Sequence, residues 1–554
     1  MIPPFPHEWA FRHAERAPDS PAVSTPTVRL TYANLAERTR SLAAHLARSG
    51  VAPGDRVLIA LPNRPATVVA GLAVNELGGT TVEVNREWDP SVLGEIVAQS
   101  GVRQAFISVR DVRKWAAALA GRRMDQLWIV AADANARDTL DDIEATERRL
   151  LFEDGRLAET LDPGPLRPPA RLQPDWPAVV LYTSGSTGRP HGVIQTFRNI
   201  DANTRSIVDY MALTADDRAL LTLPLFYCYG RSVLQTHLFV GGSVFLDHRF
   251  AFPRTVMETL ATEGCTGFAG VPLTYEIIRR SVDVSSISST RLRYVTQAGG
   301  AMAPETIAWA RRAFAPARLF VMYGQTEATA RLTYLSPERA LDKQGSIGIP
   351  IPGVELRVMD ASGHQLPDGE VGELVARGEN VTPGYLGDPE ETAAILLDGW
   401  LWTGDLAYRD ADGFFFHRGR VKEILKIGGY RISPIEIEQV VARHPDVDEA
   451  AVIGVPDDLL GEVPVAFVVT RSGTTPSEAE LRRFCQARLP AYAIPVGFDV
   501  VSALPRNETG KLMRSELSAR LERSALAAPS ADVTGGEARR RLGSQRSTSQ
   551  GDAR

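Results

Sequence analysis

Apolar residues recur at two different spacings along the first part of this chain. Leu35 to Leu46 carries apolar residues at helical spacing, whereas residues 56–61 form a compact apolar run typical of a buried strand. Further strands are predicted at residues 104–107, 127–130, 179–181, 294–296 and 319–322. Strands separated by helices predict parallel, doubly wound sheets with ligand sites where the strands end. The fold class is therefore predicted to be α/β.

A second unit begins near Gly419 and Arg420. We predict a hairpin there, followed by a helix over 434–443, strands over 449–455 and 463–470, and a helix over 477–489. These elements form a small α+β domain of about 100 residues. We expect a large N-terminal domain over residues 1–420, this C-terminal domain over 421–521, and a disordered tail over 522–554. The tail composition buries too little apolar surface to offset the entropy of ordering.

Length and composition narrow the class of protein. A chain of 554 residues is expected to form roughly two to four domains. Its net charge of -6 gives no electrostatic footprint for nucleic acid. No apolar run reaches the ~18 residues that span a bilayer, and the N-terminus has no secretory pattern. The three cysteines are widely spaced and match no metal or disulfide framework, so a cytoplasmic location is predicted.

A hydroxyl- and glycine-rich segment directly follows the strand at 179–181. It reads Thr183, Ser184, Gly185, Ser186, Thr187, Gly188. Glycine lets backbone N–H groups approach a polyanion, and hydroxyl groups add donors, so the segment is typical of a phosphate cradle. The spacing is not that of the Walker type. A linker has the same composition, but a linker is not normally flanked by an apolar strand and by a run such as residues 192–194.

Further motifs follow in a fixed order. They are Tyr-Gly-Gln-Thr-Glu at 323–327, Trp-Thr-Gly-Asp at 402–405, Gly-Arg at 419–420 and Pro-Arg-Asn-Glu-Thr-Gly-Lys at 505–511. With the cradle, this combination resembles the adenylate-forming superfamily of acyl-CoA synthetases, aryl-CoA ligases, peptide-synthetase adenylation domains and luciferases. The resemblance runs from about Tyr32 to Arg514. It implies a reaction in which a carboxylate attacks the α-phosphate of ATP, and a thiol then displaces AMP from the acyl-adenylate.

The resemblance also implies partners and a moving part. ATP, Mg²⁺ and either coenzyme A or the phosphopantetheine of a carrier protein are the expected cofactors. The small domain is expected to act as a lid that rotates about a hinge at Lys422 between the two half-reactions. Lys511 is implied to reach the substrate carboxylate and the α-phosphate, since a flexible ammonium neutralises both anions. Gly429 is expected near a pantetheine tunnel.

The remaining roles concern the nucleotide. The cradle is implied to hold the β- and γ-phosphates, Tyr323 to stack on adenine, Thr326 to contact phosphate and Glu327 to bind magnesium. Asp405 is implied to accept both ribose hydroxyls, because a carboxylate offers two oxygens and no donor. Arg420 is implied to hold the ribose or a phosphate. The predicted nucleotide-binding set also contains Gly300, Ala301, Gly324 and Gln325.

Two positions depart from the family pattern. His191 stands where most members have a phosphate-binding lysine, and a histidine is charged only when protonated. Either His191 takes over the phosphate contact, or it points to solvent and Arg189 or the loop backbone binds instead. Tyr227 follows Leu225 and Phe226 where many members have histidine.

The predicted acid pocket has an open floor and aromatic walls. No Asp lies within 227–232 to hold an amino group, which argues against an α-amino acid. Small residues at 298–301 favour an acyl or aryl chain, although core packing explains Phe268 equally well. The pocket is predicted from Tyr227, Cys228, Tyr229, Phe268, Ala298 and Gly299.

Three functions remain open from the sequence. The first is an AMP-forming acyl- or aryl-CoA synthetase. The second is a stand-alone ligase that loads a carrier protein in a natural-product pathway. The third is an enzyme that activates nitrite with ATP to diazotise an aryl amine. A catalytically dead nucleotide-binding protein is excluded, because Lys511, Asp405 and Glu327 are all retained.

Overall fold

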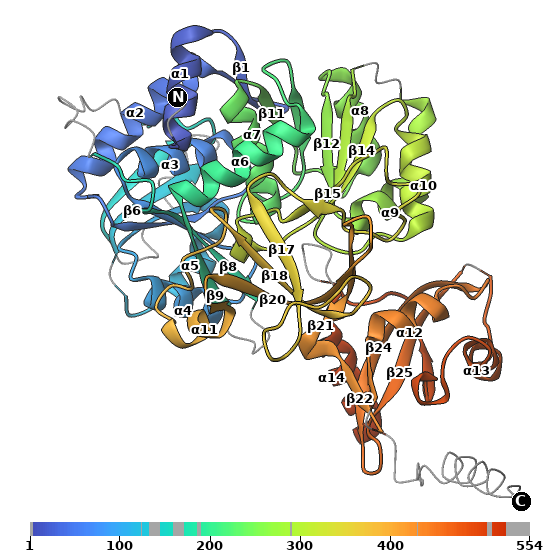
Figure 1. Ribbon diagram of the computed structural model, residues 1–554. Helices are drawn as coiled ribbons and strands as arrows, with labels where there is room; N and C mark the ends of the chain where they lie inside the picture. The colour runs from blue at the N-terminus through green and yellow to red at the C-terminus, as the bar shows by residue number, and fades with distance from the viewer. Residues whose placement is uncertain are drawn as a thin grey trace, which may run out of the picture. The chain divides into compact units, whose positions relative to one another are not determined.

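The computed structural model describes residues 4–122, 124–131, 145–158, 171–184, 190–287, 291–428, 430–471, 473–506 and 512–527. The described chain divides into two compact units, of which one ends at Glu423 and the other begins at Ile424 (Figure 1). The domain boundary expected between residues 420 and 421 lies close to this division, and it stays a prediction. Within the described ranges, no helix is long and apolar enough to cross a membrane.

The first unit contains a seven-stranded sheet in the order β7-β6-β5-β3-β4-β8-β9. Its strands are parallel except for the edge strand β9, which pairs antiparallel with β8. Each of the strands predicted at 56–61, 104–107, 127–130 and 179–181 is confirmed. The strands are β3 (Arg56–Ala60), β4 (Thr80–Glu83), β5 (Gln104–Ser108), β6 (Met124–Ala131), β7 (Ala145–Phe152), β8 (Pro177–Ser184) and β9 (Pro190–Thr196).

A second, nine-stranded sheet has the order β16-β15-β14-β13-β12-β10-β11-β1-β2. Six neighbouring strands from β1 to β14 are parallel, and β2, β15 and β16 add antiparallel edges. The strands are β1 (Pro21–Ser24), β2 (Arg29–Thr31), β10 (Arg218–Leu221), β11 (Ser243–Leu246), β12 (Gly267–Gly270), β13 (Tyr294–Gln297), β14 (Arg318–Tyr323), β15 (Thr333–Leu335) and β16 (Ile349–Pro350). The strands predicted at 294–296 and 319–322 are confirmed as β13 and β14.

Helices cover both faces of each of these two sheets (Figure 1). Val57 and Ile59 on β3 face a core shared by both sheets, whereas Leu58 and Ala60 face the opposite layer, as the two-residue period of a strand requires. The shared core holds α2 (Tyr32–Arg48), α3 (Pro65–Glu76), α6 (Phe197–Met211) and α7 (Cys228–Val240). The outer layers are α4 (Pro90–Ser100) and α5 (Val112–Ala118) on one side, and α8 (Pro253–Thr262), α9 (Pro272–Ser281) and α10 (Pro304–Ala313) on the other.

Local sequence signals set the ends of these helices. The helix predicted over 35–46 is confirmed as α2, which begins in a capping box between Thr31 and Asn34. A capping box of the same kind, between Thr196 and Asn199, starts α6 directly after β9. The N-terminal helix α1 (Pro6–Arg16) packs against α2, α3 and α7, and its Trp9 is fully buried.

A third sheet of the first unit is antiparallel and was not predicted from the sequence. Its strands are β17 (Val354–Met359), β18 (Gly372–Gly378), β19 (Leu396–Leu397), β20 (Trp400–Arg409) and β21 (Phe415–Arg420), and α11 (Pro389–Ile395) precedes β19. Short 3-10 turns are η1 (Val109–Asp111), η3 (Val284–Ser286), η4 (Thr326–Ala328) and η5 (Val421–Glu423). This third sheet carries Asp405 and Arg420, both of which are predicted to contact the nucleotide.

The second unit is a small α+β domain. Its sheet has the order β23-β22-β25-β24, with β26 parallel to β25. The predicted hairpin, both predicted strands and both predicted helices are confirmed as β22–β23, β24, β25, α12 and α13. The elements are β22 (Leu425–Ile427), β23 (Tyr430–Ile432), α12 (Pro434–Val441), β24 (Val447–Asp457), β25 (Gly461–Thr470), α13 (Glu478–Gln486), η6 (Ala491–Ala493), β26 (Gly497–Val500) and α14 (Arg514–Ala527).

The predicted fold class, with a large N-terminal α/β domain and a separate small C-terminal domain, is confirmed. The predicted tail begins inside α14, which continues to Ala527. Residues 528–554 lie outside the described part of the chain.

Candidate active site

Asp405 is a buried carboxylate that three side chains approach. It lies on β20, directly opposite Arg420 on β21. The hydroxyl of Tyr323 donates a hydrogen bond of 2.6 Å to its Oδ2, and Nε of Arg420 donates one of 3.0 Å to its Oδ1. Nε2 of His417 lies 3.5 Å from the same Oδ1. The end of β14 and the β20–β21 pair thus converge on one carboxylate.

Asp405 stays ionised although its side chain is only 4% exposed. Burial alone would raise its pKa. The hydrogen bond and charge of His417, together with the charge of Arg420, outweigh burial and lower the pKa of Asp405. The charge of Asp405 in turn raises the pKa of Arg420, while burial and then Asp405 raise the pKa of Tyr323. An ionised carboxylate of this kind is suited to accept the two hydroxyls of a vicinal diol.

The β8–β9 hairpin carries both ends of the predicted cradle. Thr183 lies directly opposite His191 across the two strands, and β8 ends at Ser184. The positions Gly185, Ser186, Thr187 and Gly188 lie outside the described residues. The cradle assignment therefore stays a prediction, placed at a hairpin edge of the seven-stranded sheet.

Gln195 connects this hairpin to the turn that carries Thr326 and Glu327. Its amide nitrogen donates hydrogen bonds of 3.0 Å to the carbonyl oxygens of Thr326 and Thr329. Gly324 lies just before the turn, where an added Cβ would come within 2.2 Å of the carbonyl oxygen of Ala330. Only glycine fits there, so backbone crowding explains this position of the motif. Gln325 is the residue that leads from Gly324 into the turn.

Tyr385 joins the same turn to His191. Its hydroxyl donates a hydrogen bond of 2.8 Å to Oε1 of Glu327, and its ring centroid lies 5.2 Å from that of His191. Oδ2 of Asp388 lies 3.5 Å from Nδ1 of His191. Within the described ranges, no three His, Cys, Asp or Glu side chains gather as a metal cluster. Glu327 still offers carboxylate oxygen, the ligand type of Mg²⁺, which takes its other ligands from water and substrate phosphates.

Three of the six predicted acid-pocket residues lie at the start of α7. Tyr227 is the N-cap residue of this helix, and Cys228 and Tyr229 form its first turn. The hydroxyl of Thr326 donates to Sγ of Cys228 at 3.5 Å. Gly299 has a φ of 88°, and an added Cβ there would lie 2.6 Å from the Tyr227 hydroxyl oxygen. Ala298 is buried, whereas Gly299, Gly300 and Ala301 are exposed after β13.

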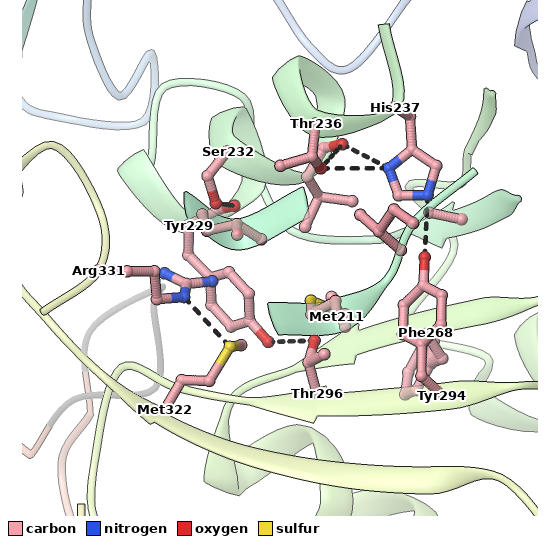
Figure 2. Close-up of a pocket in the computed structure, with 15 residues that line it drawn as sticks. Met211, Tyr229, Ser232, Thr236, His237, Phe268, Tyr294, Thr296, Met322 and Arg331 are labelled. Carbon is pink, nitrogen blue, oxygen red and sulfur yellow. Dashed lines mark hydrogen bonds between the residues drawn. The ribbon is translucent and has the colours of Figure 1, made fainter. Parts of the chain in front are cut away.

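A small cavity of ≈ 20 Å³ lies beside Tyr229 (Figure 2). By that measure it holds about one water molecule, so no aryl ring fits inside it. Of the six predicted pocket residues, all within the described ranges, Tyr229 and Phe268 line it. Phe268 is fully buried, and its ring centroid lies 6.2 Å from that of Tyr275 and 6.4 Å from that of Phe314. Phe268 therefore packs in the core and lines the cavity, and its place in an acid pocket stays a prediction.

Three other residues of the predicted site are Lys422, Gly429 and Lys511. Lys511 and Gly429 lie outside the described residues, so their roles stay predictions. Lys422 lies in η5, directly before the division between the two units.

Sequence reasoning missed Gln195, Tyr385, Asp388 and His417. A register shift between Leu406 and Ala407 leaves one extra residue on β21, which brings His417 and Arg420 to the same carboxylate. Simple strand alternation puts residues three apart on opposite faces, so it does not predict this pair. Tyr385 follows a Pro-Gly turn, a weak signal that only the fold connects with Glu327.

Comparison with known families decides the assignment. The family model for the AMP-binding enzyme matches residues 10–386, and that for the AMP-binding enzyme C-terminal domain matches residues 436–511. The chain belongs to the AMP-binding enzyme family. This confirms the resemblance to the adenylate-forming superfamily that the motifs indicated.

Relatives of this AMP-binding enzyme cover nearly the whole chain. A feruloyl-CoA synthase of an Amycolatopsis species is 34% identical over 520 residues, which are 92% of this chain and 98% of that protein. A sulfoacetate–CoA ligase of Cupriavidus necator is 35% identical over 514 residues, 91% of this chain and 95% of that protein. The solved o-succinylbenzoate CoA synthetase (MenE) of Bacillus subtilis, in complex with ATP and magnesium ion, has a TM-score of 0.76 and 28% identity. It covers 92% of this chain and 99% of its own.

These findings establish the reaction class. The AMP-binding enzyme described here is an AMP-forming acid–thiol ligase of the acyl-CoA synthetase type, as predicted. Carrier-protein loading and nitrite activation, the two other functions left open by the sequence, are not favoured by these relatives.

Proposed function

We propose that this enzyme uses ATP to convert a carboxylic acid into an acyl-adenylate and then transfers the acyl group to coenzyme A. The observation that carries the proposal is Asp405, a buried carboxylate kept ionised by His417 and Arg420 and bonded to Tyr323. Burying an ionised carboxylate costs free energy, and a neutral residue would fill the same space without that cost. A nucleotide ribose supplies the two hydroxyls that this carboxylate is suited to accept.

The other nucleotide contacts are assigned to the elements around Asp405. We assign adenine stacking to Tyr323 and the ribose or a phosphate to Arg420. The β- and γ-phosphates are assigned to the cradle from Thr183 to Gly188, which the β8–β9 hairpin presents. His191, opposite Thr183, is placed to supply further donors on that hairpin. Gly300, Ala301, Gly324 and Gln325 complete the proposed nucleotide wall.

Magnesium is assigned to Glu327. The donor set fits a hard cation, because it offers carboxylate oxygen and no competing thiolate or imidazole cluster within the described ranges. When bound, the ion supplies charge neutralisation at the transferring phosphate. Tyr385 orients the carboxylate through its 2.8 Å hydrogen bond, so Glu327 presents its remaining oxygen in a fixed direction.

The chemistry requires two anions to meet. Positioning and electrostatic stabilisation supply most of the rate enhancement in such a reaction, since it needs no covalent intermediate with the protein. We assign neutralisation of the acid carboxylate and the α-phosphate to Lys511, and phosphate contact to Thr326. Lys422 is the proposed hinge, supported by its place in η5 just before the second unit begins at Ile424.

The acid is assigned to the start of α7. Tyr227, Cys228 and Tyr229 form the proposed wall, with Ala298 and Gly299 on the opposite side and Phe268 behind. The contact between Thr326 and Cys228 supports this placement, because it joins the phosphate-binding turn to the pocket. Gly429 is proposed to border the path of the coenzyme A thiol.

We also propose a cytoplasmic location. Cys228, Cys265 and Cys485 are all free and buried, which is the usual state of thiols in a reducing compartment.

An exchange assay tests the proposed function. The purified enzyme is given ATP, Mg²⁺ and labelled pyrophosphate with a panel of carboxylic acids and nitrite, and the return of label into ATP is measured. We expect exchange with at least one carboxylic acid, followed by thioester formation when coenzyme A is added. Exchange with nitrite alone, or with no acid, would contradict the proposal.

A further inference from the structure

Arg331 is a buried cation at the wall of the small cavity. Its residue is only 3% exposed, and its guanidinium lies 4.1 Å from the centroid of the Tyr229 ring (Figure 2). It donates hydrogen bonds to the carbonyl oxygen of Ala330 at 3.1 Å and to the sulfur of Met322 at 3.4 Å. A guanidinium carries five N–H donors, and both of these acceptors are uncharged.

No carboxylate of the described chain forms an ion pair with Arg331. The ionisable side chains on which its charge acts are Tyr210, Tyr227, Cys228 and Tyr229. Burial raises the pKa of each of these groups, that of Tyr229 to about 12, so all four are neutral near pH 7. Arg331 is therefore surrounded by neutral aromatic and sulfur groups.

Arg231 on α7 shows the usual arrangement. Its side chain is 14% exposed, so it is mostly buried, and it forms an ion pair with Glu83 at the end of β4. Arginine is almost never fully buried without a partner, because removing an unpaired charge from water has a large cost in free energy. A cation–π contact with the ring of Tyr229 offsets only part of this cost. Arg331 thus lacks the anion that Arg231 has.

Tyr229, whose ring faces the guanidinium of Arg331, is one of the residues assigned to the acid. Tyr229 and Met322 line the cavity with Arg331, and Cys228 contacts the phosphate-binding Thr326. Thr296 accepts or donates a 2.7 Å hydrogen bond with the Tyr229 hydroxyl, and Ser232 adds a further hydroxyl to the cavity wall. The missing anion therefore belongs on the acid itself.

We propose that Arg331 selects acids that carry a second anionic group, a carboxylate or a sulfonate, in addition to the carboxylate that is activated. The inference rests on the proposed function, since it assumes that the acid enters at the start of α7. The small cavity has no room for a longer chain or a ring, so the second anion is the last group of the acid and meets Arg331 at the cavity wall. A monoanionic acid leaves the guanidinium unpaired and binds less tightly.

Matched acids test this selection on the intact enzyme. Malonate and succinate are compared with malonamate and succinamate, in which a carboxamide of the same shape replaces the second carboxylate. Initial rates of AMP formation give kcat/KM for each acid. We expect the dianionic acid of a pair to be preferred by at least ~10², because rejecting an analogue that leaves buried donors unpaired reaches this size or more.

Two variants then separate selection from folding. Arg331→Met keeps the length of the side chain without charge and should bring the ratio within each pair close to one while leaving KM for ATP unchanged. Arg103→Met removes an arginine whose side chain is 76% exposed, and should keep the wild-type ratio.

The failures of the two proposals are distinguishable. Equal use of dianionic and amide acids by the wild type, or better use of propanoate or benzoate than of any dianionic acid, overturns the role of Arg331 and leaves acid activation intact. Activity with nitrite alone overturns both. An Arg331→Met enzyme that keeps the full wild-type ratio also overturns the role of Arg331.

Discussion

The hydroxyl of Tyr385 donates a 2.8 Å hydrogen bond to the carboxylate of Glu327, across 58 positions of sequence. The proximity of Glu327 contributes to the raised pKa of Tyr385, after burial, so the phenol remains a donor at physiological pH. A tyrosine outside every recognised motif thus orients the proposed magnesium ligand.

Removing this hydroxyl should weaken the use of magnesium. In Tyr385→Phe, Glu327 loses a donor of about 1 kcal/mol, so the Mg²⁺ concentration that gives half-maximal exchange should rise roughly fivefold. Tyr430→Phe is the control, because that ring is exposed on the second unit. An unchanged magnesium dependence in Tyr385→Phe would show that Glu327 needs no orientation.

Asp405→Asn should damage both nucleotide binding and stability. The change removes the negative charge that faces Arg420 and His417, and breaking a buried pair in this way costs about 3–5 kcal/mol. KM for ATP should rise by at least ~10², and the melting temperature should fall. Asp342→Asn, which breaks an exposed pair with Arg339, should change neither quantity measurably. Wild-type KM for ATP in Asp405→Asn would remove the ribose assignment.

Lys511→Ala should separate the two half-reactions. A cation that meets developing charge is worth at least as much as one oxyanion donor, ~10²–10³ in rate. Adenylate formation should fall by that factor or more, whereas thioester formation from presynthesised adenylate should continue. Equal loss in both assays would refute the assigned role.

Lys422→Pro should have the opposite effect. Proline fixes φ near −65°, which obstructs rotation at the proposed hinge. Pyrophosphate release should continue while thioester formation stops. Lys422→Ala is the matched control and should retain both half-reactions, since it removes the side chain without restricting the backbone. Survival of both in Lys422→Pro would place the pivot elsewhere.

His7 should make the protein sensitive to acid. Burial lowers the pKa of His7 from 6.5 to about 3. Between pH 6.5 and about pH 3, His7 therefore binds a proton in the unfolded chain but not in the folded chain. Stability should therefore fall as pH drops from 6.5 towards 3, with a contribution of at most ~1.4 kcal/mol per pH unit. Urea unfolding of His7→Leu should show a shallower loss, whereas the exposed control His364→Gln should follow the wild type. Identical slopes in wild type and His7→Leu would contradict this.

The sequence predicted the parallel sheets because their strands are buried on both faces and carry a strong apolar signal, as β3 and β14 do. It did not predict the antiparallel sheet of β17 to β21, whose short half-exposed strands and turns give only weak periodicity. The motif residues around Asp405 were found from their order. Tyr385, His417 and Arg331 were not found from the sequence, because their roles depend on contacts between distant segments that no local sequence pattern indicates.

The pairing of Asp405 with Arg420 has a mechanical consequence. Arg420 is the last residue of β21, and the segment that leads to the second unit leaves β21 directly after it. On the proposed assignment, a nucleotide bound by Arg420 restrains the start of that segment. By reciprocity, whatever restrains the segment must alter nucleotide affinity by the same factor. Occupancy of the proposed ribose site and freedom of the connecting segment are therefore expected to be coupled in one equilibrium.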